Sequence, residues 1–297
     1  MDRRQFLATG MVGIAMARTA AQTGIDRPLS AHTGRLRQSV ARWCFADIPL
    51  ESFCRQLQAM GVTGMDLAGP DEWDICRHYA ITPCMILGAG TFLPAKPGSP
   101  RMFGPSVGWN KRDNHARLVE SARTSIELGV QAGVHGIVGL FGDREGMSDE
   151  QGIENCVTGL RQIVPILEEN DFTLAFELLN SKVDHPDYQG DNTAFGVAVC
   201  REVGSDKVKL LYDAYHMQIM EGNLISTIRE NIEYIYHIHV AGVPGRHELD
   251  ENQEVNWHAV ANAIADLNFS GYVAHEWIPT GVDPMTDLRT AVKIMTV

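Results

Sequence analysis

The chain has 297 residues, of which 44% are hydrophobic and 21% are charged, as is usual for a globular protein with a sizeable core. This length allows one large α/β domain or two small ones. The formal net charge is -12, and no cluster of Lys and Arg is apparent. Because binding to a phosphate backbone depends on such clusters, we expect no nucleic-acid partner.

The first 21 residues differ from the rest of the chain. Arg3 and Arg4 are followed by Phe6 and Leu7, then by a mildly apolar stretch that contains Gly and Ala, and then by small residues suited to a signal peptidase. This arrangement resembles a twin-arginine export signal. We therefore expect residues 1–21 to be a signal peptide, residues 22–36 a leader, and the mature protein to be periplasmic. The apolar stretch is too short for a membrane span.

Strands and helices alternate eight times after this leader, without a break in composition. The apolar runs predict strands at 38–44, 62–67, 81–87, 134–141, 172–178, 208–213, 234–239 and 272–276. The amphipathic segments predict helices at 50–60, 72–79, 112–132, 149–169, 193–203, 224–231, 257–267 and 286–294.

This alternation predicts a single (β/α)8 TIM barrel over residues 37–297, with no second domain. The rival architecture is a doubly wound open sheet. Such a sheet for nucleotides needs a glycine-rich turn after its first strand. Residues 42–45 have the sequence Arg-Trp-Cys-Phe, which is nothing like such a turn.

Four consecutive predicted strands end in residues that can bind a metal: Glu177, Asp213, His239 and Glu276. Alternation along each strand places all four on the inward face. The site of a TIM barrel lies at the carboxyl ends of its strands, so we expect the four side chains to converge. Three carboxylates and one imidazole suit Mn²⁺ or Mg²⁺, and could also take Co²⁺ or Zn²⁺. A cation would also relieve the repulsion between the carboxylates.

Other polar residues near these strand ends fit this pattern less well. His237 lies one layer deeper, and His275 points outward, so both are interpreted as packing or supporting groups. Asp66 ends the second predicted strand and either joins the site or caps the next helix.

The segment 88–110 carries Phe92, Phe103 and Trp109 and is too long for a plain connection, which favours a lid or binding loop.

Four segments resemble the hydroxypyruvate isomerase family, within the xylose-isomerase-like barrels that include ketose 3-epimerases. They are FELLN around Glu177, YDAYHMQ around Asp213, HIHVAGVPGRHE around His239 and VAHEW around Glu276. The likeness covers about residues 37 to 280. It implies that these four residues bind one divalent metal, with Glu177 and Glu276 also acting as the catalytic acid/base pair. Hydroxypyruvate isomerases often carry Gln at position 239, whereas ketose epimerases carry His.

The same resemblance implies that His216 and Arg246 bind substrate oxygens. For Arg246 the alternative is a solvated loop charge paired with Glu248. The expected partner is a small sugar or hydroxy-keto acid, and a homo-oligomer is compatible with the sequence.

The expected function is a metal-dependent isomerase or epimerase that moves a proton between carbons through an enediolate. One alternative is a lyase that uses the same site to eliminate a group from 3-keto-glycosides. A second is a non-catalytic sugar-binding protein. A third, a phosphodiesterase, would need a basic face that the chain lacks.

Export is predicted to depend on the arginine pair. Replacing Arg3 and Arg4 together with Lys should leave the precursor in the cytoplasm, because the twin-arginine route requires this pair. Cell fractionation with immunodetection measures the outcome. Normal periplasmic accumulation of the double variant would contradict the signal assignment.

Overall fold

The computed structural model describes residues 34–86 and 104–297. The expected signal peptide, nearly all of the expected leader and most of the segment 88–110, with Phe92 and Phe103, lie outside the described residues. Within the described ranges no helix is long and apolar enough to cross a lipid bilayer.

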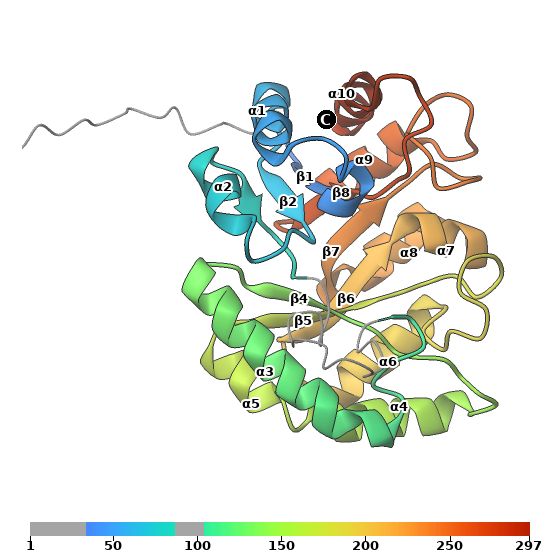
Figure 1. Ribbon diagram of the computed structural model, residues 1–297. Helices are drawn as coiled ribbons and strands as arrows, with labels where there is room; N and C mark the ends of the chain where they lie inside the picture. Colours follow the sequence, from blue (N-terminus) through green and yellow to red (C-terminus); the bar gives the residue numbers. More distant parts are fainter. Residues whose placement is uncertain (1–33, 87–103) are drawn as a thin grey trace, which may run out of the picture.

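Eight parallel strands form the centre of the molecule (Figure 1). Their order is β3-β2-β1-β8-β7-β6-β5-β4, and the barrel closes between the segment after β3 and strand β4, where Ile86 bridges in parallel to Ile137. Their bounds are β1 Arg37–Ala41, β2 Gly64–Asp66, β3 Thr82–Pro83, β4 Gly136–Gly139, β5 Thr173–Glu177, β6 Val208–Asp213, β7 Ile235–Val240 and β8 Tyr272–His275. The predicted (β/α)8 barrel is confirmed.

Helices connect the strands and cover the outside of the barrel (Figure 1). They are α1 Leu50–Met60, α2 Trp73–His78, α3 His115–Ala132, α4 Asp149–Leu160, α5 Val164–Glu169, α6 Thr193–Val203, α7 Ala214–Met220, α8 Leu224–Asn231, α9 Trp257–Asp266 and α10 Pro284–Met295. Three short 3-10 helices are η1 Arg42–Phe45, η2 Arg112–Asn114 and η3 Ile232–Tyr234.

Two predicted elements differ from the structure for local reasons. The single helix expected over 149–169 is two helices, α4 and α5, and Pro165 lies in the first turn of the second. Proline has no N–H to donate, so it suits a first turn and interrupts a helix interior. Helix α7, directly after β6, was not predicted. Its seven residues are too few to show a helical period.

Alternation along the strands separates two apolar layers. Phe172, Leu174 and Phe176 of the β5 segment belong to the large core that includes the helices, whereas Ala175 belongs to a smaller cluster with Leu211 and Val138. The smaller cluster fills the barrel interior, as period-2 alternation requires. Glu177 follows the phase of Ala175, so its position at the open end of the barrel was predicted correctly.

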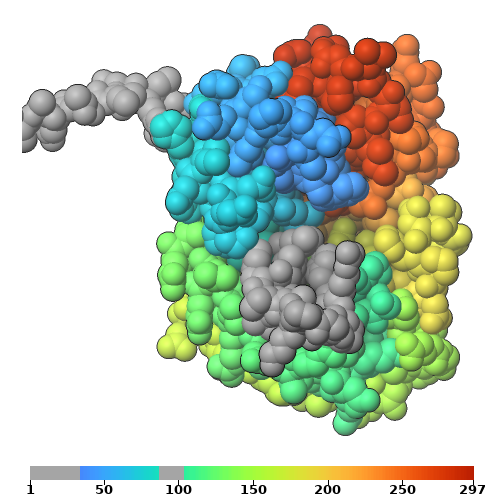
Figure 2. Space-filling view, in the orientation of Figure 1, coloured from blue at the N-terminus to red at the C-terminus, as the bar shows by residue number. Residues whose placement is uncertain are grey.

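The two ends of the barrel sequence meet. Strands β1 and β8 pair in parallel, with Ser39 opposite Ala274. On the surface, the first described segments and the C-terminal helix accordingly lie side by side (Figure 2). His275 points outward from this seam, as expected. Its Nε2 contacts Gln38 Oε1 at 2.8 Å, and Gln38 donates to Val292 O in α10.

Candidate metal centre

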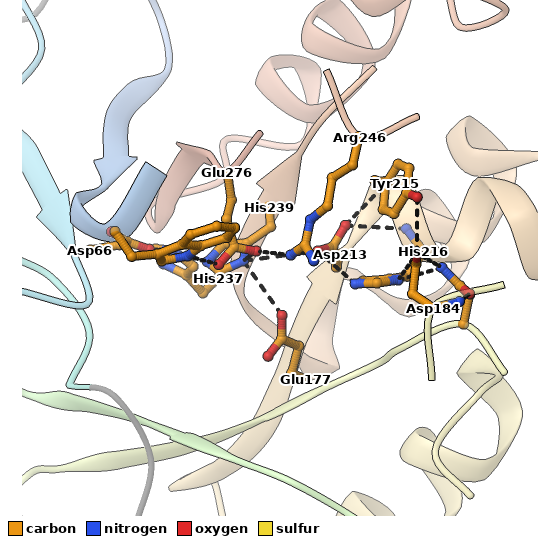
Figure 3. Close-up of polar contacts among 12 residues, drawn as sticks. Asp66, Glu177, Asp184, Asp213, Tyr215, His216, His237, His239, Arg246 and Glu276 are labelled. Atoms are coloured by element: carbon orange, nitrogen blue, oxygen red, sulfur yellow. Dashed lines mark hydrogen bonds and ion pairs between the residues drawn. The ribbon is translucent and has the colours of Figure 1, made fainter. Parts of the chain in front are cut away.

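The four predicted strand-end residues converge. One ligand atom from each of Glu177, Asp213, His239 and Glu276 lies within 4.8 Å of the others (Figure 3). Glu177 and Asp213 are the last residues of β5 and β6, His239 lies in β7, and Glu276 directly follows β8. Three of the four are buried, and the Glu177 side chain is 13% exposed.

His239 lies between the three carboxylates. Its Nδ1 is 2.9 Å from Glu276 Oε2, 3.7 Å from Glu177 Oε1 and 4.0 Å from Asp213 Oδ2. A single imidazole nitrogen therefore faces three acidic side chains.

Helix α7 fixes the orientation of Asp213. Asp213 Oδ1 accepts from Tyr215 N at 2.8 Å and from His216 N at 3.2 Å, so Asp213 caps the helix. Its other oxygen, Oδ2, remains directed toward His239. Asp213 is thus both a helix cap and a member of the site.

Asp66 belongs to the site and does not cap the next helix. It is fully buried, and its Oδ2 contacts His237 Nε2 and, at 3.2 Å, His239 Nε2. The N-cap position of α2 is occupied by Glu72. The sequence signal for Asp66 was the same as for the three convergent carboxylates, namely an acidic residue at the end of a barrel strand.

Arg246 also lies in the site, so the alternative of a solvated charge paired with Glu248 is wrong. Its Nη2 donates to Glu276 Oε2 at 2.7 Å and is 4.0 Å from Asp213 Oδ2. Glu248 instead accepts from Thr280. Although Arg246 sits in a loop, its side chain is only 18% exposed.

Trp43 is a site residue that was not predicted. It lies in η1, directly after β1, and its Nε1 donates to Glu276 Oε1 at 2.8 Å. The Arg246 guanidinium carbon is 5.5 Å from the centre of the Trp43 ring. In the structure its ring is 44% exposed just after a strand. Exposure cannot be read from sequence, so no sequence signal marked Trp43 as a site residue.

His216 is completely buried beside Asp213. Asn180 Oδ1 accepts from Val183 N and Asp184 N, which orients the Asn180 amide so that its Nδ2 donates to His216 Nδ1 at 2.7 Å. The proton of the neutral ring therefore sits on Nε2. That nitrogen has no hydrogen-bond partner among the described residues and is 3.6 Å from Asp213 Oδ2.

A cavity of about 300 Å³ opens over these groups. Its lining is largely apolar and includes the charged side chains of Glu177, Arg246 and Glu276. It is lined by Trp43, Leu67, Pro105, Val138, Leu140, Glu177, Leu179, His185, Arg246 and Glu276. Trp109, expected as an aromatic wall, is instead 1% exposed and packs into the core.

Burial and charge act against each other in this site. Burial raises the pKa of Asp213 to about 7, although Arg246 and His239 oppose the shift. For Glu276 burial also favours the neutral acid, but His239, Arg246 and Trp43 outweigh it and hold its pKa well below the usual range. Burial lowers the pKa of His216, so its ring is neutral. The crowded carboxylates thus depend on nearby positive charge.

The eight parallel strands form a closed barrel, and the clustered ionisable side chains lie at the carboxyl ends of the strands. This is the architecture of a TIM barrel, which carries its site at that end. Residues 89–296 match the family model described as "Xylose isomerase-like TIM barrel", and the chain belongs to this family.

Two curated relatives are similar over part of the chain. The 2-oxo-tetronate isomerase of Cupriavidus necator is 36% identical over 107 residues, covering 36% of this chain and 40% of that protein. The hydroxypyruvate isomerase of Escherichia coli is 31% identical over 134 residues, covering 45% and 51%. The chain thus matches about half the length of such relatives. The 3-keto-D-glucoside 4-epimerase of E. coli shares the fold, with a TM-score of 0.68, 18% identity and coverage of 88% and 98%.

Arg246 is predicted to stabilise the metal-free protein. Arg246→Met should lower the free energy of unfolding by about 3 kcal/mol, because it removes the guanidinium that donates to the buried Glu276 carboxylate. Urea unfolding in the presence of a chelator measures the effect. The exposed pair of Arg35 and Asp266 supplies the control, since Arg35→Met should cost less than about 1 kcal/mol. Equal losses in both variants would contradict the prediction.

Proposed function

We propose that the protein is a divalent-metal-dependent isomerase or epimerase of a small sugar or hydroxy-keto acid. The observation that carries this proposal is the convergence of three carboxylates and His239 Nδ1 within 4.8 Å of one another. Such a set is repulsive unless a cation balances it. The export predicted from residues 1–21 adds the proposal that the enzyme works in the periplasm.

The donor set fits a hard divalent ion. We assign Glu177, Asp213, His239 and Glu276 as the ligands of Mn²⁺ or Mg²⁺, since oxygen-rich sites with one imidazole suit these ions. When bound, the ion would supply polarisation of a substrate carbonyl and stabilise negative charge on its oxygen.

The two glutamates have different surroundings, which suggests different roles in proton transfer. Glu276 accepts from Trp43 at Oε1 and from Arg246 at Oε2, so its charge is stabilised. Glu177 lines the cavity, and its contact with His239 is longer, at 3.7 Å. We assign Glu177 to removal of the proton next to the substrate carbonyl, and Glu276 to its return at the other carbon or face.

Arg246 and His216 are proposed to bind substrate oxygens. Arg246 lines the cavity, and its buried Nε has no hydrogen-bond partner among the described residues. His216 is completely buried beside Asp213 and is not among the residues that line the cavity, but its Nε2–H is likewise unpartnered among the described residues. Buried donors without partners are costly, so a substrate oxygen would satisfy them.

The names of the similar proteins support this class of reaction. Both curated relatives are named isomerases, and the structural neighbour is named an epimerase of a keto-glucoside. A lyase would share the first proton removal and differ in its product. A sugar-binding protein would catalyse no proton exchange.

Substrate size is the first property to test. The cavity of about 300 Å³ has the half-exposed Trp43 ring in its wall, an aromatic surface on which a sugar face could stack. We expect a sugar-sized ketose or keto-glycoside to be turned over at least ~10-fold more efficiently than hydroxypyruvate, or roughly 1.4 kcal/mol in transition-state binding. Incubation of each compound in D₂O, followed by NMR, identifies the exchanged carbon and the product.

An eliminated product in that screen would favour the lyase, and bound sugar without exchange would favour the binding protein. Equal or better turnover of hydroxypyruvate would contradict the size prediction.

The glutamates are predicted to be essential for turnover. Glu177→Gln and Glu276→Gln should each lower kcat by about 10²–10⁴-fold, because each removes a proton-transfer group. Asp213→Asn and His239→Ala should mainly weaken metal binding. Steady-state kinetics and metal analysis of purified protein separate these effects. The matched control is Glu248→Gln, in the loop and outside the site. A near-native rate with full metal content in Glu177→Gln would refute its assignment.

A further inference from the structure

A second group of ionisable residues lies directly behind the four proposed ligands. Asp66, His237 and His239 come from β2 and β7, and each is at most 2% exposed. Figure 3 shows the two histidines and Asp66 next to Glu276. His239 is the member shared by both groups.

The hydrogen bonds of this group determine which nitrogens carry protons. One oxygen of Asp66 lies against two imidazole nitrogens, an arrangement that suits a carboxylate accepting from both. An ionised carboxylate can only accept hydrogen bonds. Asp66 Oδ2 contacts Nε2 of both histidines. Both Nε2 atoms must therefore be the protonated, donating nitrogens.

From this geometry we propose that Asp66 is a positioning residue that fixes the tautomer of His239. In the absence of a cation, Nδ1–H donates to Glu276 Oε2 at 2.9 Å. A cation bound among Glu177, Asp213 and Glu276 would replace that proton, while Asp66 keeps the other proton on Nε2, so that the Nδ1 lone pair is the one available to the ion. His237 is the second donor to Asp66 Oδ2 and holds that oxygen in place. The inference rests on the metal-dependent function proposed above and deepens it.

The position of Asp66 suits this role. Carboxylates that accept from the far nitrogen of a metal-bound histidine commonly contribute 10–100-fold to metal affinity. Asp66 is fully buried, so water does not compete for its oxygen. Its distance of 3.2 Å to His239 Nε2 is at the long end of the range for a hydrogen bond. The other ring nitrogen lies 2.9 Å from Glu276 Oε2.

The same three residues could instead hold a second ion, with His239 bridging two metals. Three ligands are fewer than the four of a closed structural site. Both histidines already form hydrogen bonds with Asp66 Oδ2. The two arrangements differ in one atom, because a bridging imidazolate has no N–H proton, whereas the proposed arrangement keeps one on Nε2.

Cobalt substitution tests the proposal. We expect the full chain, loaded with Co²⁺, to bind one ion per chain. Its proton NMR spectrum should show one solvent-exchangeable, paramagnetically shifted signal, from His239 Nε2–H, which exchanges slowly because Asp66 holds it. Two ions per chain, or one bound ion with no such signal, would overturn the assignment.

Variants of Asp66 supply the second test. Asp66→Ala should weaken Co²⁺ affinity by about 10–100-fold and accelerate exchange of the shifted proton. Asp66→Asn keeps an acceptor oxygen in the same place and should recover most of the affinity. The matched control is Gln38→Ala, which removes the partner of the outward-facing His275 and should leave Co²⁺ affinity unchanged.

The outcomes separate this inference from the proposed function. If the unaltered protein binds Co²⁺ and turns over substrate, but Asp66→Ala changes neither the affinity nor the proton exchange, only the role of Asp66 is overturned. If the unaltered protein binds no Co²⁺, both are overturned. A loss of affinity in Gln38→Ala equal to that in Asp66→Ala would show a general packing effect and would also overturn the role.

Discussion

The accumulation of negative charge around His239 is the constraint on which the site depends. Glu177, Asp213 and Glu276 all approach one imidazole nitrogen, in surroundings where burial favours neutral acids. Without positive charge, the fold would have to tolerate buried like charges at close range, which costs several kcal/mol per ion. The structure supplies Arg246 from outside the strands, and the proposed metal would supply the rest.

In the barrel, the strands position the charged groups of the site, and the connecting segments supply the side chains that hydrogen-bond to them. Strands β5 to β8 bring the ligand groups to one end, since parallel strands present their carboxyl ends together. The 3-10 helix η1 and the loop after β7 then provide Trp43 and Arg246, which hold the two oxygens of Glu276. Rigid strands thus set the positions of the charges, and the connecting segments set their hydrogen bonds.

The surroundings of the two glutamates differ because side chains from the connecting segments reach Glu276. Glu276 is held by donors on both oxygens, whereas Glu177 borders the cavity. Two identical side chains can therefore take different parts in one proton transfer, because donors hold both oxygens of one glutamate while the other borders the cavity. Behind them, Asp66 and His237 extend the polar network one layer deeper into the barrel.

Sequence alone determined the barrel and the four convergent residues. Strand alternation and helix periodicity are local, and β6, α1, α6 and α8 have the bounds predicted for them. Sequence did not decide which loop residues turn inward. Arg246 was left between substrate and solvent, Trp43 was missed, Asp66 was left between cap and site, and Trp109 proved to be a core residue. These outcomes depend on contacts between distant strands and loops, such as that of Trp43 with Glu276, and no local period encodes them.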